Sequence, residues 1–520
     1  MVNIVYAHKR HPVEPLGIGY MSSAVARGGH RSKMVLTSPK RMEAAVEQTL
    51  RAIDENQADI LAQSIIFGSH GYAADLSRRV QQARPKVISV LGGPAATFTP
   101  ELIDRGFDVI CRYEGEASFL EFCNALQNGG DVGNIPNIWV KENPALYRTK
   151  VKRVKTITDV NDPRYKDESG FDQGRRRFVN ATRRLLEGDA LNEVPHPDRI
   201  ILYEHDLYGQ GPIKHFMHTR GCAFRCAYCF NVVQNMEMKG KGKSVRFRIH
   251  QDVVDEINEV RQAGFPIELV YFQDDVFGPA YTVVHARDFA EVYKREVGLP
   301  FHAHVRFDLI KPEVADALAD AGCTGVHAAI EAGNDDIRNR VHRRDMSTRQ
   351  VIGGATELRR NGIRMMTQNI LGAPGETWAQ MMETLELNIL VKPTFASASI
   401  FQPYPGTAAL EFARDHGSLP TKDLNDLIDT FGNSTFYNGS ILIMDPEEKK
   451  RLEVFQSFFA IAVENPELYR SGELERMMLP HIQNGGSNAE LREMYRKHRD
   501  RLDEVLYGVK FRDVVTADEE

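Results

Sequence analysis

The sequence contains few cysteines for its length, six in 520 residues, and only two tryptophans. Three of the cysteines lie within one short segment and the other three are scattered. Disulfide-stabilised secreted domains spread many cysteines through much shorter chains, so that class is excluded. The cysteine pattern instead indicates a reducing compartment and one local metal site.

The sequence also lacks any run of 18 or more apolar residues, and its first residues lack the apolar core of a signal peptide. We therefore expect no membrane partner and a cytoplasmic location. The net charge of −6 argues against a nucleic-acid partner, which needs a concentrated basic face. The Arg-rich stretch at residues 174–178 is interpreted as a solvated linker face.

The length of the chain predicts two or three domains, and its 42% hydrophobic content is typical of a globular protein. Residues 1–140 alternate strand and helix patterns, which predicts an α/β fold with a parallel, doubly wound (Rossmann-like) sheet. Strands are expected at Asn3–Tyr6, Met34–Leu36, Asp59–Phe67, Lys86–Leu91 and Phe107–Cys111, and helices at Gly17–Arg27, Met42–Ile53, Ala73–Ala83 and Glu101–Arg105.

Residues 141–210 are charged and contain several prolines, and we interpret them as an interdomain segment packed on its neighbours. A second alternating pattern over residues 211–406 predicts a partial (β/α)6 barrel, whose chemistry belongs at the carboxyl ends of its strands. Its strands are expected at Ile213–Thr219, Ile267–Phe272, Phe301–Val305, Gly325–Ile330, Met365–Leu371 and Ser397–Phe401.

Residues 407–520 are predicted to be helical. Their aromatic and methionine side chains recur at helical spacing, which favours a helical core over a substrate contact. These side chains are Phe455, Phe458, Phe459, Tyr469, Met477, Met478 and Tyr495.

The clustered cysteines are Cys222, Cys226 and Cys229. Three thiolates at spacings of four and three can hold one iron–sulfur cluster while leaving one iron open for a chelating substrate. A structural zinc site is the alternative, but it needs a fourth ligand. His218 is the candidate for that role, yet it is expected on the preceding strand.

This CxxxCxxC motif, with Tyr228 before its last cysteine and a barrel strand before it, resembles the signature of the radical S-adenosylmethionine (SAM) superfamily. The resemblance implies that Cys222, Cys226 and Cys229 bind a [4Fe–4S] cluster and that Tyr228 contacts the cofactor. The open iron then chelates SAM, and one-electron reduction cleaves SAM to methionine and a 5′-deoxyadenosyl radical.

Residues after the later strands fit the same resemblance. The family places groups that contact SAM and substrate after these strands, which implies that Asp274, Asp275 and Arg306 are catalytic. By the same resemblance, Ile330–Asn334 is similar to a SAM-contacting IExG stretch, residues 372–377 to a GxPGET turn and residues 402–407 to the PYPGT end of the core. The implied cofactor-binding residues here are Gln273, Glu331, Gly372 and Pro374. Helix capping by the aspartates and simple turns at the glycines are the alternatives.

The N-terminal region resembles the cobalamin-binding domains of B12-dependent radical SAM enzymes, as does the interdomain stretch Leu191–Asp198. In those domains the corrin lies over the strand ends and its nucleotide tail lies beside a Gly-Gly turn. The resemblance implies cofactor contacts from Pro15, Leu16, Gly17, Ser64, Gly92, Gly93, Glu114, Gly115 and Glu116. The DxHxxG motif that supplies a histidine to cobalt is absent, which implies a five-coordinate or water-bound cobalt. His11 is an alternative ligand, although a turn or surface role is favoured.

The combined resemblance is to the class B radical SAM methyltransferases. It implies methyl transfer from methylcobalamin to an unactivated carbon or phosphorus of a small molecule, with flavodoxin or ferredoxin as electron donor. A B12-dependent cyclase or rearrangement enzyme is one alternative. Another is a radical SAM oxidoreductase whose N-terminal domain is only a binding module. The transfer-RNA methylthiotransferases are excluded because only Cys111 and Cys123 lie in the N-terminal region and the C-terminus is acidic.

Overall fold

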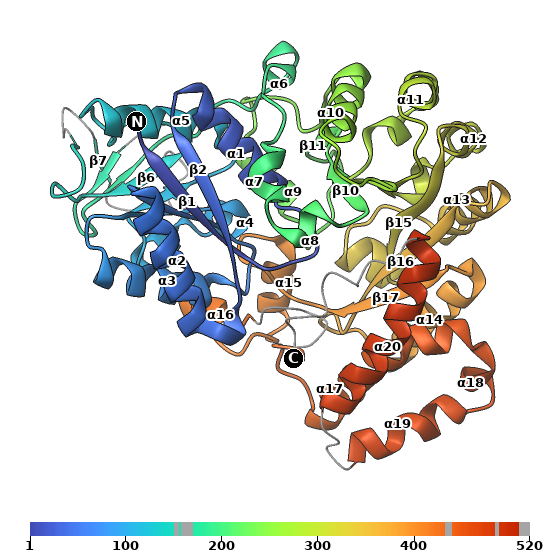
Figure 1. The fold of residues 1–520 in the computed structure, drawn as a ribbon. Helices are drawn as coiled ribbons and strands as arrows, with labels where there is room; N and C mark the ends of the chain where they lie inside the picture. The colour runs from blue at the N-terminus through green and yellow to red at the C-terminus, as the bar shows by residue number, and fades with distance from the viewer. Residues whose placement is uncertain (150–154, 158–169, 432–438, 484–487, 509–520) are drawn as a thin grey trace. The chain divides into compact units, whose positions relative to one another are not determined.

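The structure is a computed structural model that describes residues 1–149, 155–157, 170–431, 439–483 and 488–508. The chain forms two compact units (Figure 1). The N-terminal unit comprises Met1–Gly209 and Val233–Lys243, and the C-terminal unit comprises Gln210–Val232 and Ser244–Glu520. The division into segments 1–140, 141–210, 211–406 and 407–520 stays a prediction. No helix among the described residues is long and apolar enough to cross a membrane.

The N-terminal unit contains a nine-stranded sheet whose first five strands are parallel and run in the order β2-β1-β3-β4-β5. This is a doubly wound order with its switch point between β1 and β3, where ligands bind beyond the carboxyl ends. The strands are β1 (Asn3–Lys9), β2 (Arg31–Thr37), β3 (Ile60–Ser64), β4 (Ile88–Gly92), β5 (Val109–Cys111), β6 (Ile138–Lys141), β7 (Lys155–Ile157), β8 (Gly170–Asp172) and β9 (Arg177–Val179).

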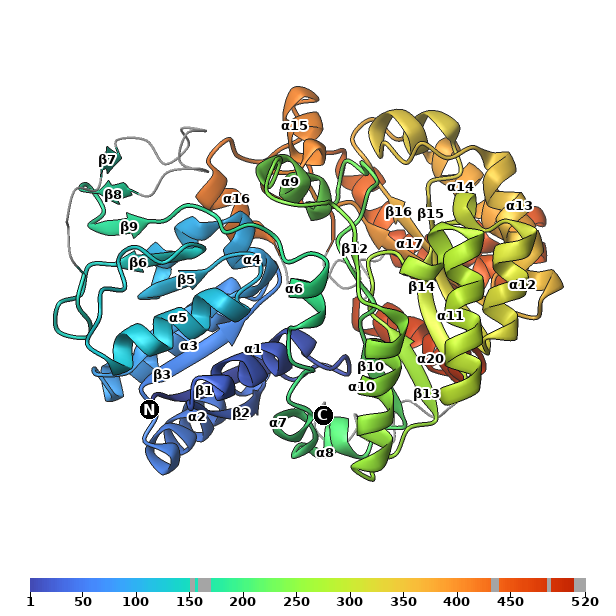
Figure 2. The same cartoon turned by 90° about the horizontal axis from the view of Figure 1, so that it is seen from above.

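Helices cover both faces of this parallel sheet. Val5, Ala7 and Leu61 of the sheet pack on α2 and α3, while α1 and α5 contact each other on the opposite face (Figures 1 and 2). The helices are α1 (Leu16–Arg27), α2 (Met42–Asn56), α3 (His70–Ala83), α4 (Gly93–Phe98), α5 (Glu116–Gln127), α6 (Asp189–Asn192), α7 (Arg199–Tyr203) and α8 (Asp206–Gly209). Burial on both faces explains why β1, β3 and β4 are nearly continuous apolar runs.

The segment from residue 138 onward extends the sheet by β6, β9, β8 and β7. The interpretation of the Arg-rich stretch as a solvated face was wrong for Arg177. Its side chain is fully buried, pairs with Asp104 and Asp172, and lies over the ring of Trp139. Because two carboxylates compensate the guanidinium, this buried charge stabilises the sheet extension instead of facing a partner.

The C-terminal unit contains six parallel strands in the order β10-β13-β14-β15-β16-β17, as the predicted partial barrel requires. The strands are β10 (Ile213–Phe216), β13 (Leu269–Phe272), β14 (Phe301–Val305), β15 (Cys323–Glu331), β16 (Arg364–Leu371) and β17 (Phe395–Ile400), and the helices between them are α10 (His250–Gln262), α11 (Val283–Glu296), α12 (Pro312–Asp320), α13 (Thr348–Arg360) and α14 (Trp378–Val391).

The first barrel strand is shorter than expected, since β10 ends at Phe216. His218 therefore follows the strand instead of lying on it. Thr219–Arg220 forms a separate strand, β11, which pairs antiparallel with β12 (Arg246–Phe247). The helix predicted at Glu101–Arg105 is a 3-10 helix, Pro100–Arg105.

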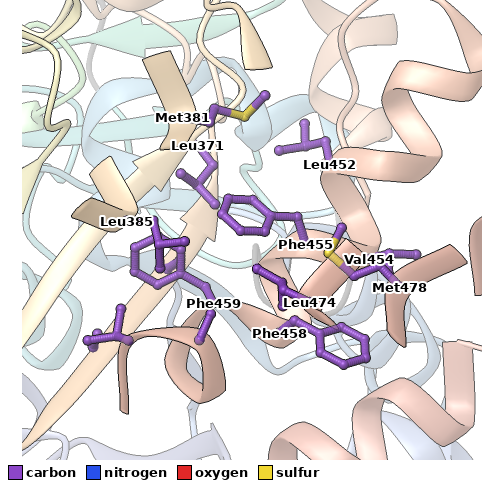
Figure 3. Close-up of a cluster of buried hydrophobic side chains, with 14 of the residues drawn as sticks. Leu371, Met381, Leu385, Leu452, Val454, Phe455, Phe458, Phe459, Leu474 and Met478 are labelled. Carbon is purple, nitrogen blue, oxygen red and sulfur yellow. The ribbon is translucent and has the colours of Figure 1, made fainter. Parts of the chain in front are cut away.

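The C-terminal helices supply a core for the last barrel strands (Figure 3). Phe455, Phe458 and Phe459 of α17 pack with Leu371, Leu385 and Met478, as predicted for helical core residues. The side chain of Tyr495 lies outside the described residues. These helices are α15 (Ala408–Asp415), α16 (Leu424–Thr430), α17 (Pro446–Glu464), α18 (Pro466–Arg470), α19 (Glu473–Gln483) and α20 (Asn488–Tyr507), and α9 (Phe230–Glu237) precedes β12.

Truncation of this core should destabilise the C-terminal unit. Phe459 is fully buried, so Phe459→Ala is expected to cost about 3–5 kcal/mol and to lower the thermal unfolding temperature. The matched control is Leu479→Ala on α19, where the side chain is 47% exposed. Equal unfolding temperatures for the two variants in calorimetry would show that α17 is not part of the core.

Candidate functional site

The three cysteines lie on a loop that follows β11. Gly221 starts this loop at a φ of +79°, and a Cβ there would collide with the carbonyl oxygen of Ser244. The middle of the loop is held from two sides, because Ala227 donates to the carbonyl of His342 at 2.9 Å and accepts from Ala409 N at 3.0 Å. The loop therefore has one backbone path that presents its sulfurs.

The cysteine side chains are largely shielded from solvent, with Cys222 and Cys226 buried. Burial raises the pKa of Cys222 and raises that of Cys229 to about 12. Free thiols are therefore neutral here, and a metal cluster has to displace their protons on binding. No three His, Cys, Asp or Glu side chains of the described residues gather as ligands of a single ion would. Cluster thiolates each bind a different iron, so they need not converge on one point.

Nitrogen donors point at the cysteine sulfurs. Cys226 Sγ accepts from Arg344 Nη1 at 3.4 Å and from Arg306 Nη1 at 3.7 Å, and Cys229 Sγ accepts from Asn231 Nδ2 at 3.6 Å. Such N–H···S bonds stabilise thiolates and tune a bound cluster. The donor set therefore fits an anionic iron–sulfur cluster.

Arg306 follows β14, as predicted, and two neighbouring side chains hold its guanidinium in place. Asp308 accepts from its Nε at 3.0 Å and from its Nη2 at 3.1 Å, and the guanidinium lies 3.6 Å from the centroid of the Phe224 ring. The aromatic face and the bidentate carboxylate together fix the cation beside Cys226.

Tyr228 and Glu331 meet at this site, as the sequence motifs implied. The Tyr228 hydroxyl donates to Glu331, and Arg344 Nη1 lies 3.4 Å from the same hydroxyl. Burial raises the pKa of Glu331, and the charge of Arg344 opposes this shift. Glu331 has a φ of +69° at an irregular point of the β15–β16 pairing, which turns its carboxylate to the strand end.

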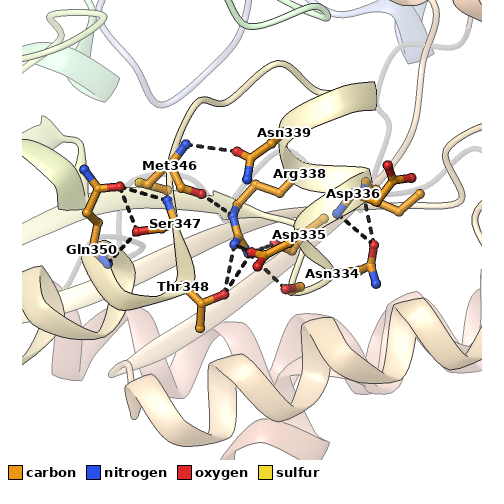
Figure 4. Close-up of polar contacts among 12 residues, drawn as sticks. Asn334, Asp335, Asp336, Arg338, Asn339, Met346, Ser347, Thr348 and Gln350 are labelled. Atoms are coloured by element: carbon orange, nitrogen blue, oxygen red, sulfur yellow. Dashed lines mark hydrogen bonds and ion pairs between the residues drawn. The ribbon is translucent and has the colours of Figure 1, made fainter.

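The loop after Glu331 is organised around Arg338, a fully buried residue in the π-helical turn Ile337–Val341 (Figure 4). Its guanidinium donates to the carbonyls of Ala332, Gly333 and Met346 at 2.7–2.9 Å. It also donates to Asp335 and to Thr348. One side chain thus joins both ends of the loop that carries Arg344.

The residues that follow β13 are Gln273, Asp274 and Asp275, and contacts within the protein hold them. Asp274 is fully buried, and His218 N donates to its Oδ2 at 3.3 Å. Burial raises the pKa of Asp274 to about 7, and hydrogen bonds from Thr219 and His218 oppose the rise. Its Oδ1 has no partner among the described residues. Desolvation by its surroundings raises the pKa of Asp275, and a hydrogen bond with Asn231 opposes the rise. The backbone N–H of Gln273 donates to Phe216 O at 2.8 Å.

The GxPGET turn closes on itself. Glu376 Oε2 accepts from Gly372 N at 2.7 Å and from Ala373 N at 3.0 Å, and Thr377 begins α14 with a capping box. Gly372 has a φ of +77°, and Pro374 is buried in the turn. Glu376 Oε1 and Gln402 Oε1 are buried without partners among the described residues. These acceptors, with Asp274 Oδ1, suit a ligand with donor groups such as SAM.

In the N-terminal unit, Ser64, Gly92 and Gly93 meet at the ends of β3 and β4. Gly93 has a φ of +87°, and a Cβ there would lie 2.7 Å from Ile65 O and 2.9 Å from Ser64 Oγ. The missing side chain lets the turn lie directly on the β3 end. Ile66, next to this turn, is 59% exposed, so an apolar side chain is available to a ligand there. A smooth backbone turn beside an apolar residue fits the tail and ring of cobalamin.

The other predicted cobalamin contacts lie at the ends of neighbouring strands. Pro15, Leu16 and Gly17 begin α1 after β1, with Gly17 exposed. After β5, Glu114 Oε2 accepts from Leu186 N at 2.8 Å, so it holds the extension segment. A Cβ on Gly115 would lie 2.8 Å from Cys111 Sγ, so this glycine permits close packing of α5, whose first residue, Glu116, is buried.

His11 lies in a local turn after β1. Its Nδ1 accepts from Val13 N at 3.1 Å. The turn role favoured from the sequence is what the structure shows.

Sequence reasoning missed Arg344, Arg338, Asn231 and Ile66. The one available signal was the basic pair Arg343-Arg344 close after a strand-end Glu331, in a loop that ends at the helix-capping Ser347. Such pairs are usually solvated, so the burial of Arg344 could not be read from the sequence.

Comparisons with known proteins identify two domains in this chain. A family model described as the radical SAM superfamily matches residues 216–387, and one described as a B12 binding domain matches residues 2–122. The uncharacterized methyltransferase PH0819 of Pyrococcus horikoshii is 25% identical over 413 residues, which cover 78% of this chain and 80% of that protein. The anaerobic magnesium-protoporphyrin IX monomethyl ester cyclase of Rubrivivax gelatinosus is 22% identical over 85% of this chain and 71% of its own length.

Among solved structures, the radical SAM methyltransferase TsrM from Kitasatospora setae, with cobalamin and a [4Fe–4S] cluster bound, has a TM-score of 0.58. The two sequences are 17% identical, and the match covers 80% of this chain and 75% of TsrM. This similarity shows a shared fold.

Each cluster cysteine should be required for iron. Cys222→Ala, Cys226→Ala and Cys229→Ala are expected to reduce the iron content after anaerobic reconstitution from about four per chain to near zero. Cys323→Ala is the matched control, since Cys323 is buried on β15. Iron analysis and the absorption of the cluster check this, and full iron in any of the three variants contradicts the assignment.

The Gly93 turn should be required for cobalamin. Gly93→Ala closes the turn and Ile66→Asp places a charge beside it, so both are expected to reduce cobalamin retention at least tenfold, about 1.4 kcal/mol. Gly71→Ala on α3 is the control, because nothing lies within 4 Å of its added Cβ. Retention is measured by absorption after desalting. Wild-type retention in the Ile66→Asp variant would place the cofactor elsewhere.

Proposed function

Since this chain belongs to the radical SAM enzymes that carry a B12-binding domain, we propose that it is a methyltransferase acting on an unactivated carbon or phosphorus of a small molecule. Its cofactors are a [4Fe–4S] cluster, SAM and cobalamin. The observation that carries the proposal is that two different cofactor sites can be recognised in one chain. The three-cysteine loop has N–H donors at its sulfurs, and the turn at the end of β4 has a glycine, Gly93, where a side chain would collide with the backbone.

The residues of the barrel would have separate tasks. Cys222, Cys226 and Cys229 hold the cluster and leave one iron open for SAM. The carboxylates of Asp274 and Glu331 and the turn at Gly372 and Pro374 follow barrel strands and would orient SAM. Tyr228, bonded to Glu331, would keep that carboxylate aligned. Gln273, Asp275 and Arg306 would line the path to the substrate or the cluster.

Pairing of the two cofactors has a chemical reason. Cobalamin supplies a methyl group to a radical, and the cluster with SAM makes that radical where the substrate offers no nucleophile. The protein aligns the groups and excludes water. Residues 15–17, Ser64, Gly92, Gly93 and 114–116 would hold cobalamin. A reductant supplies the electron for the cluster, and we propose a flavodoxin or ferredoxin for this role.

A cyclase or rearrangement reaction with the same cofactors is the second candidate. The similarity to the Rubrivivax gelatinosus cyclase over most of this chain favours it. Both candidates need the cluster and cobalamin, so they differ in what happens to the methyl group of SAM. An assay for methyl transfer separates them without knowledge of the substrate.

The test uses the full chain reconstituted anaerobically with iron, sulfide and hydroxocobalamin. About one cobalamin and about four irons per chain are expected after desalting. With a strong reductant and SAM carrying a deuterated methyl group, a methyltransferase forms S-adenosylhomocysteine and labelled cobalamin, both measured by mass spectrometry. Cys226→Ala serves as control, since it should retain the methyl label on cobalamin but lose 5′-deoxyadenosine.

Other outcomes would contradict the proposal in distinct ways. Formation of 5′-deoxyadenosine without S-adenosylhomocysteine favours the cyclase candidate. Four irons without retained cobalamin leave a radical SAM enzyme whose N-terminal unit has another role.

A further inference from the structure

Arg344 carries a buried charge without a direct carboxylate partner, since Glu331 acts on it only across the Tyr228 hydroxyl. Its side chain is only 7% exposed, and no carboxylate of the described residues lies within ion-pair distance of it. Three other buried arginines differ. Arg177, Arg248 and Arg306 each have carboxylate partners at 2.5–3.2 Å.

A buried guanidinium without an anion is costly, and such charges are normally paired. The partners of Arg344 are Cys226 Sγ at 3.4 Å, the Tyr228 hydroxyl at 3.4 Å and the carbonyl of Ala329 at 2.8 Å. Its Nε is buried without a partner among the described residues. Of these partners, Cys226 is the one that becomes an anion when a cluster binds.

The position of Arg344 is fixed by its backbone as well. Its N–H donates to Arg338 O at 3.0 Å, and its carbonyl accepts from Arg306 Nη2 at 2.8 Å. The loop around Arg338 thus sets the distance from the guanidinium to the sulfur. Arg306 contributes less net charge to the same sulfur, because Asp308 compensates it.

We propose that Arg344 is a positioning residue that raises the reduction potential of the cluster through its fixed positive charge and its N–H bond to Cys226. The external donor adds one electron to the oxidised cluster, which gains one negative charge. A fixed cation nearby stabilises that reduced form, because hydrogen bonds and charge at the sulfurs set cluster potentials. The proposal rests on the assignment of Cys226 as a cluster ligand.

The test compares reconstituted, SAM-free full-length protein with its Arg344→Gln, Arg344→Lys and Arg340→Gln variants. Iron content is measured first, and the midpoint potential is then measured by redox titration with electron paramagnetic resonance. At the wild-type midpoint, Arg344→Gln should lower the reduced-to-oxidised ratio about tenfold, a shift of about 59 mV to more negative potential. Arg344→Lys keeps the positive charge but not the guanidinium geometry, so it should lower the same reduced-to-oxidised ratio only about threefold.

Arg340→Gln is the matched control. Arg340 lies in the same loop, but its side chain is 59% exposed and paired with Asp336, so no shift is expected. A full-iron Arg344→Gln variant with the wild-type potential overturns the proposal, and weakened SAM binding in that variant would then assign the SAM carboxylate as the anion. If the Arg344→Gln variant binds no cluster, the midpoint potential of the Arg344→Lys variant tests the proposal. A potential equal to or more positive than that of the wild type then overturns the proposal.

The proposed function fails separately. Absence of methyl transfer despite a normal potential contradicts the methyltransferase and not the role of Arg344, whereas absence of iron from the reconstituted wild-type protein contradicts both.

Discussion

Parallel pairing of the strands is the constraint on which both candidate sites depend. The strands β1–β5 of the N-terminal sheet are parallel, and so are the six strands of the barrel. In each set the carboxyl ends of the strands therefore lie at one edge of the sheet. The strand interiors are apolar because both faces are covered, and polar residues or glycines come directly after the last buried residue. Gly93 after β4 and Arg306 after β14 are examples from the two units.

At the barrel edge, the arrangement of charge is what distinguishes a cofactor site from an ordinary polar end. Arg306 is neutralised by Asp308, and Glu331 is held by Tyr228, but the charge of Arg344 has no carboxylate partner. Burial raises the pKa of Cys222 and Cys229, so these two free thiols keep their protons at neutral pH. The thiolates of a bound cluster would place negative charge beside Arg344.

The loop after β15 shows how distant sequence positions are brought to that site. Arg338 binds carbonyls at both ends of the loop, and this closes a segment of more than ten residues around one guanidinium. The closed loop carries His342, whose carbonyl holds the cysteine loop, and Arg344, which faces Cys226. A single buried polar side chain thus couples the two loops, and its multiple bonds offset the cost of its burial.

Local patterns were sufficient for the α/β class, the two alternating sheets and the cysteine loop. Apolar periodicity and the fixed spacing of Cys222, Cys226 and Cys229 are properties of neighbouring residues, so they can be read without a fold. The motifs implied a cofactor contact for Tyr228 and for Glu331 separately, and the hydrogen bond between these residues, 103 positions apart, came only from the structure.

Burial of charge was decided only by the tertiary structure. Arg177 and Arg344 each belong to an Arg-rich stretch that reads as solvated, yet the fold buries one between two carboxylates and the other against a cysteine. The physical reason is that the free energy of a charge depends on partners distant in sequence, and local spacing carries no information about them.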